Sequence, residues 1–175
     1  MDELRAEVTI ERQPDEIYRY LVDVANYPEF CDHFLVDWHL TREDTIGVGA
    51  GVRFRIEGRD RFGWGDMTIV EAQPPRLIVA RGRSSRFNRI RTVYEWTLTP
   101  SATGTTTTVS LSVQRDAQAP FDRIRDALGG RWVEQRRWRR ALGRLEGVIE
   151  RGEGHGKRVT LSGGPRKPAT GSPLR

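Results

Sequence analysis

The sequence has few of the residues that mark disulfide-bonded, metal-binding or membrane-spanning proteins. A single cysteine, Cys31, among 175 residues excludes an internal disulfide. No Cys-x-x-Cys or His-Glu-x-x-His motif occurs and the three histidines are isolated, so we expect no metal and no cofactor. No run approaches the ~20 apolar residues that cross a bilayer. The first residues include acids where a signal peptide would be basic and then apolar. We therefore expect a cytoplasmic protein.

Positive charge is concentrated toward the end of the chain. The net charge is +5, and residues 120–151 and 152–175 contribute +4 each, which leaves −3 for residues 1–119. Residues 152–175 are rich in Gly, Pro and Ser and show no periodicity, which predicts a disordered basic tail after a folded domain at residues 1–151. The basic helix and tail are candidate contacts for an anionic membrane surface. The lack of aromatic residues in the tail disfavours nucleic acid.

The folded part alternates short strand patterns with helix patterns. Period-two alternation predicts seven strands, at about residues 4–12, 34–43, 52–60, 62–72, 77–84, 90–100 and 105–115. Val36, Trp38 and Leu40 are expected on one side of the second strand. Pro14 and Pro28 each predict a short helix. Apolar residues at helical spacing predict one long helix from Phe121 to Ile149. This order predicts an α+β fold, with a curved seven-stranded antiparallel sheet, two short helices and one long C-terminal helix.

Four short motifs lie at the starts and ends of these elements. They are Gln13-Pro14-Asp15-Glu16-Ile17, Tyr20-Leu21-Val22-Asp23, Tyr27-Pro28-Glu29-Phe30 and the glycine-rich stretch from Gly47 to Phe54. Over residues 3–150 the chain resembles the START-like, or SRPBCC, superfamily, which has the helix-grip fold. Within it, the chain is most similar to the polyketide cyclase/dehydrase and lipid-transport group and to the coenzyme-Q-binding group. The resemblance implies a hydrophobic cavity between sheet and long helix, since members bind lipids, quinones, polyketides or plant hormones.

Aromatic residues give the clearest functional signal. Alternation places several of them on the inner face of the sheet, and two tryptophans face them from the long helix. A glutamine lies where leucine is expected on that helix, so its amide needs a partner from the sheet or from a ligand. The residues expected to line a pocket for a small hydrophobic ligand are Trp38, Phe54, Tyr94, Trp96, Trp132 and Gln135. The same aromatic residues would also suit an ordinary core.

Few residues are placed for acid–base chemistry. Cys31, Asp32 and His33 are adjacent, but consecutive helical residues point about 100° apart, so a nucleophile–base pair is not expected. Glu134 is interpreted as a counter-charge to the arginines of the outer helix face. We therefore expect no catalytic residue, and a carrier or sensor of a lipid, quinone or polyketide-like ligand. A polyketide cyclase/dehydratase-type enzyme and an interaction module using the basic helix face and tail are the alternatives.

Overall fold

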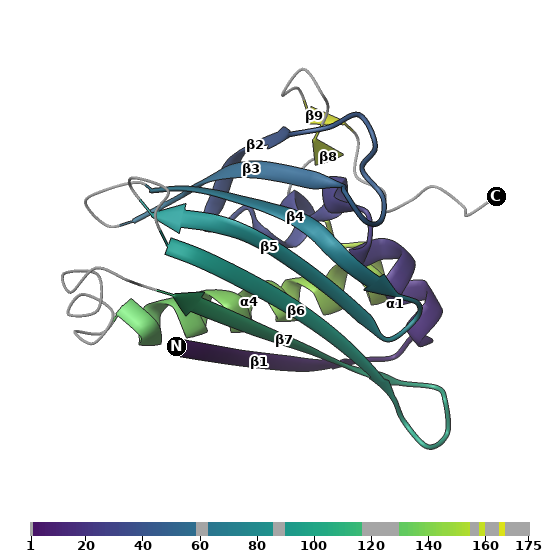
Figure 1. Ribbon diagram of the computed structural model, residues 1–175. Coiled ribbons are helices and arrows are strands. Elements are labelled where there is room, and N and C mark those ends of the chain that lie inside the picture. The colour runs from purple at the N-terminus through teal and green to yellow at the C-terminus, as the bar shows by residue number, and fades with distance from the viewer. Residues whose placement is uncertain are drawn as a thin grey trace.

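A seven-stranded antiparallel sheet curves across one side of the molecule (Figure 1). The computed structural model describes residues 2–58, 63–85, 90–116, 130–154, 158–159 and 165–166. The strands are β1 (Asp2–Ile10), β2 (Leu35–Leu40), β3 (Gly51–Ile56), β4 (Gly63–Gln73), β5 (Leu77–Ser85), β6 (Ile90–Pro100) and β7 (Thr107–Asp116). Their order in the sheet is β1-β7-β6-β5-β4-β3-β2, so the first two strands of the chain form its opposite edges. The predicted α+β helix-grip fold is confirmed.

Short helices connect the two edge strands. Helix α1 (Pro14–Leu21), the 3-10 turn η1 (Val24–Asn26) and helix α2 (Pro28–Cys31) follow β1 in that order. Both helices begin at a proline, as predicted, because proline needs no hydrogen-bond partner in the first turn. The Asp23 carboxylate accepts a hydrogen bond from the Ala25 N–H at 3.1 Å and so caps η1.

Helix α4 (Arg131–Arg151) lies against one face of the sheet, behind it in the view of Figure 1. The predicted start of this helix at Phe121 lies outside the described residues. The helix ends at Gly152, whose φ of 73° is left-handed and whose N–H donates to the carbonyls of Gly147 and Val148. The face of α4 toward the sheet carries Trp138, Ala141, Leu142 and Leu145, and each of these is at most 2% exposed.

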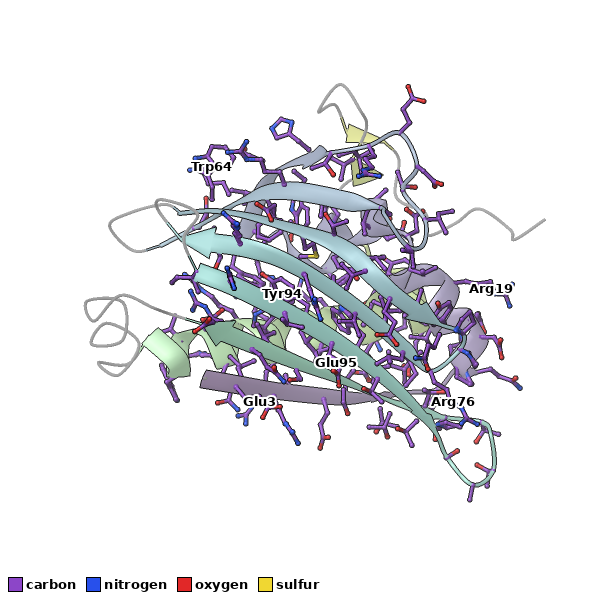
Figure 2. The ribbon with its side chains drawn as sticks, in the orientation of Figure 1. Glu3, Arg19, Trp64, Arg76, Tyr94 and Glu95 are labelled. Atoms are coloured by element: carbon purple, nitrogen blue, oxygen red, sulfur yellow. The ribbon has the colours of Figure 1, made fainter. Side chains whose placement is uncertain are left out.

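The inner face of the sheet is buried at every second residue of its central strands. In β6 the buried positions are Ile90, Thr92, Tyr94, Trp96 and Leu98. Tyr94 and Glu95 lie on opposite faces of this strand, and both are labelled in Figure 2. Trp64 of β4 lies on the outer face, where the Arg53 guanidinium lies 5.1 Å from its ring centroid.

The alternation expected of β2 is broken at Asp37. This residue has a φ of 52°, and the pairing register with β3 shifts between Val36 and His39. A β-bulge places an extra residue in one strand, and aspartate tolerates the left-handed conformation better than most residues. As a result Leu35 and Trp38 are buried. The prediction that Val36 shares the inner face with Trp38 is therefore wrong.

Two short strands lie within the predicted tail. Strand β8 (Arg158–Val159) pairs with β9 (Pro165–Arg166) in an antiparallel ladder. Val159 is only 4% exposed and belongs to the hydrophobic core, where β8 packs against η1, α2 and β2. At these residues the structure differs from the disorder expected of the tail. Burial of an apolar side chain offsets the entropy lost when a chain segment is ordered.

Candidate ligand-binding interior

Aromatic side chains from the sheet and the helices meet between the sheet and α4. We call this set the aromatic cluster, and its members are Tyr27, Phe30, Phe34, Tyr94, Trp96 and Trp138. Trp96 of β6 is central, because its ring lies 6.1 Å from Tyr27, 6.2 Å from Phe30 and 6.5 Å from Trp138, measured between centroids. These three contacts are edge-to-face, which is a favourable arrangement for aromatic rings.

A second aromatic pair lies nearer the β2 edge of the sheet. The rings of Trp38 and Phe54 are 4.9 Å apart, and both side chains are buried. The Trp38 indole N–H donates to the Leu35 carbonyl at 2.7 Å, so its polar group is satisfied within the protein. Of the residues predicted from the sequence to line a pocket, Trp38, Phe54, Tyr94 and Trp96 do lie on the inner side of the sheet.

The structure does not bring Trp132 or Gln135 into this interior. Trp132 is 65% exposed, and the Arg136 guanidinium lies 5.7 Å from its ring centroid. Six residues at about 100° each place Trp132 some 120° around the helix from the buried Trp138. The expectation that Trp132 faces the sheet is therefore wrong. The Gln135 amide donates to the Arg5 carbonyl of β1 at 3.4 Å, so it has found its partner in the sheet.

Two polar groups of the aromatic cluster are buried without a hydrogen-bond partner in the described part of the chain. They are the Tyr27 hydroxyl and the Trp96 indole N–H, and each side chain is 1% exposed. Burial raises the pKa of Tyr27 well above its usual value, and the nearby Trp96 N–H opposes part of that rise. Burial also raises the pKa of Tyr94, and the negative charge of Glu134 adds to the rise. Both tyrosines are therefore neutral near pH 7.

The inner face becomes polar toward one end of β5, β6 and β7. Arg115 of β7 forms an ion pair with Glu134 of α4, and both side chains are partly buried. Ser84 and Thr92 hydroxyls lie 3.0 Å apart on neighbouring strands, and both residues are buried. Sequence reasoning missed this polar region. The alternation that places Val113 inward extends two residues further to Arg115, so the signal was present in the sequence.

The adjacent Cys31, Asp32 and His33 join α2 to α4. Asp32 forms an ion pair with Arg144 at 2.6 Å, and His33 Nε2 lies 3.2 Å from the Arg137 carbonyl oxygen. The Cys31 thiol is fully buried, which raises its pKa well above its usual value and disfavours the nucleophilic thiolate. Asp32 and His33 therefore attach α2 to the arginine-rich helix α4.

Among the described residues, no group of His, Cys, Asp and Glu side chains is placed to hold a metal ion. The described helices also include none with the length and hydropathy needed to cross a membrane. Between residues 136 and 144 of α4, the exposed arginines are Arg136, Arg139 and Arg140, which point away from the sheet. Arg137 instead lies over the Phe34 ring at 5.9 Å. The predicted outer arginine face of this helix thus includes only some of its arginines.

Comparison with known proteins agrees with this architecture. The family model for polyketide cyclase/dehydrase and lipid transport matches residues 1–150. The NMR structure of KanY is similar at 15% identity and a TM-score of 0.67, over 85% of this chain and 97% of that one. The crystal structure of TTHA0849 from Thermus thermophilus has 16% identity and a TM-score of 0.64, with the same coverage.

The crystal structure of DynU16, described as a putative protein in the dynemicin biosynthetic locus, is similar in fold over part of its length. It has 18% identity and a TM-score of 0.60, over 87% of this chain and 48% of that one. A search of curated proteins found no match. The predicted resemblance to the SRPBCC superfamily is confirmed. The chain belongs to the polyketide cyclase/dehydrase and lipid-transport family.

Proposed function

We propose that this protein binds a flat or elongated apolar molecule between the sheet and α4, as a carrier or sensor. The observation that carries the proposal is the aromatic cluster, in which Trp96 joins the sheet to α2 and α4. Aromatic walls offer a large contact area with little loss of side-chain entropy. Membership of the polyketide cyclase/dehydrase and lipid-transport family supports a small hydrophobic ligand, such as a lipid, a quinone or a polyketide.

The inward residues Trp38, Phe54, Tyr94 and Trp96 are the proposed ligand contacts. They come from β2, β3 and β6, so together they span much of the width of the sheet. A ligand that reaches from Trp38 to Trp96 would lie across the strands and beneath α4. The rings of these residues lie in contact with neighbouring rings, so binding requires that some of them move apart.

The test is a titration of the full chain with fluorene, a rigid apolar probe, followed by the probe's own emission. Trp96→Phe should weaken binding about three- to tenfold, since it removes aromatic contact area from the centre of the cluster. Trp132→Phe changes an exposed ring of the same type and should leave the affinity unchanged. Absence of binding to the wild-type protein would refute the proposal. Equal affinities with a less cooperative unfolding of Trp96→Phe would indicate a plain core.

A second candidate function is catalysis of the cyclase/dehydratase type, and the Arg115–Glu134 pair favours it. Glu134 supplies a carboxylate beside the inner face, where it raises the pKa of Tyr94. A positioned carboxylate of this kind can take a proton from the carbon beside a ketone.

The enzyme hypothesis predicts that the protein cyclises a linear poly-β-ketone with loss of water, detected by mass spectrometry. Glu134→Gln should then lower the rate at least about 100-fold. Glu146→Gln, twelve residues later on α4, is the matched control and should keep the rate. If no product forms with the wild-type protein, or if both variants have the same rate, Glu134 has no catalytic role.

A further inference from the structure

The Tyr27 hydroxyl and the Trp96 N–H are the polar groups of the interior that most need explanation. Each belongs to a side chain that is 1% exposed, and neither has a hydrogen-bond partner in the described part of the chain. A buried donor without an acceptor is costly, and native proteins rarely keep one. The Trp38 indole shows how the same group is normally satisfied, since it donates to a backbone carbonyl.

These two groups come from separate parts of the fold. Tyr27 lies between η1 and α2, and Trp96 lies in the middle of β6. Their ring centroids are 6.1 Å apart at an interplanar angle of 69°, and the indole N–H is near enough to affect the ionisation of the hydroxyl. The Trp96 N–H lowers the pKa of the Tyr27 hydroxyl as a hydrogen-bond donor does, but the two groups do not meet the geometry of an ordinary hydrogen bond. Two donors are therefore available to one acceptor in the same region.

We propose that Tyr27 and Trp96 form a two-donor site for one neutral oxygen acceptor of the ligand, such as a ketone or quinone carbonyl. This inference rests on the proposed ligand-binding function and adds to it the chemical class of the ligand. A carbonyl oxygen has two lone pairs and can accept from both the O–H and the N–H. A carboxylate suits the place less well, because its charge would be buried among the apolar side chains of the core.

The test compares two probes of nearly the same shape, 9-fluorenone and fluorene, which differ in one carbonyl group. Wild-type protein should bind fluorenone at least about tenfold more tightly than fluorene. Tyr27→Phe removes only the hydroxyl and should reduce that preference to about threefold or less, with little change in the affinity for fluorene. The expected changes follow from the net worth of one or two hydrogen bonds to the carbonyl.

Tyr20→Phe is the matched control, because the Tyr20 hydroxyl already donates to the Glu29 carboxylate at 3.0 Å. This variant should keep the preference for fluorenone and lower the melting temperature. Tyr27→Phe should keep or raise the melting temperature, since it removes a buried group that has no partner in the free protein.

Three results would overturn the inference. Equal affinity of wild-type protein for both probes would exclude the donor site and leave the proposed function standing. No binding of either probe would reject both. If Tyr27→Phe kept the full preference, or destabilised the protein as much as Tyr20→Phe does, the hydroxyl would be satisfied internally, for example by a buried water molecule.

Discussion

Replacing Trp138 with alanine is expected to lower the free energy of unfolding by about 3–5 kcal/mol, whereas Trp132→Ala should change it by no more than about 0.5 kcal/mol. The two tryptophans lie six residues apart on the same helix, but Trp138 is 2% exposed and Trp132 is 65% exposed. The Trp138 ring contacts Phe34 at 5.1 Å and Tyr94 at 6.0 Å between centroids, so its removal leaves a cavity between α4 and the sheet.

Urea denaturation of the full chain, followed by far-UV circular dichroism, would measure both changes without relying on tryptophan emission. Trp138→Phe is a milder variant that keeps a ring against Phe34, and it should lose roughly a third to a half as much stability as Trp138→Ala. Similar losses for Trp138→Ala and Trp132→Ala would contradict the placement of α4 against the sheet.

Stability is also expected to fall from about pH 9 upward, and the two buried tyrosines Tyr27 and Tyr94 should together contribute roughly 2.7 kcal/mol for each pH unit once the pH exceeds about 11. In the unfolded chain a tyrosine loses its proton near its ordinary pKa of 10.0, whereas burial raises the pKa of both Tyr27 and Tyr94 in the folded chain. Above pH 10 the unfolded state therefore binds fewer protons than the folded state, so rising pH favours unfolding. The stability linked to these two hydroxyls is fully present below about pH 9.

Urea midpoints measured from about pH 9 to about pH 12 would show this slope at the upper end of the range. Tyr27→Phe and Tyr94→Phe should each reduce it by about 1.4 kcal/mol per pH unit, because each removes one of the two protons. Burial also raises the pKa of Cys31 and of Tyr18, which adds to the loss and is the same in these variants. A double variant with an unchanged slope would show that neither hydroxyl ionises on unfolding.

Local patterns in the sequence predicted the secondary structure well, because they depend on neighbouring residues. The alternation of Val109, Leu111 and Val113 identified both β7 and its inner face. Pro14 fixed the start of α1, since a proline is readily accepted only in the first turn of a helix. The inward positions of Trp96 and Phe54 followed from the same period of two.

Departures from these patterns were not predicted, because each depends on contacts between distant parts of the chain. The bulge at Asp37 shifts the register of β2, and a carboxylate oxygen of Asp37 accepts a hydrogen bond from the Arg55 guanidinium at 2.6 Å. Trp132 satisfied a loose helical spacing but lies outside the stripe that the sheet covers. Glu134 was interpreted as a counter-charge on the outer face of the helix, but in the structure it forms an ion pair with Arg115 of β7.

The sequence by itself determined the order of the elements, the antiparallel sheet and which side of most strands is apolar, since residue type and spacing control local conformation. Only the tertiary structure decided which polar groups meet inside. Tyr27 and Trp96 lie 69 positions apart in the sequence, and nothing in either neighbourhood indicates that their donors share one buried region. Their proximity results from the packing of the η1–α2 segment against the middle of β6, where both groups are buried away from bulk solvent.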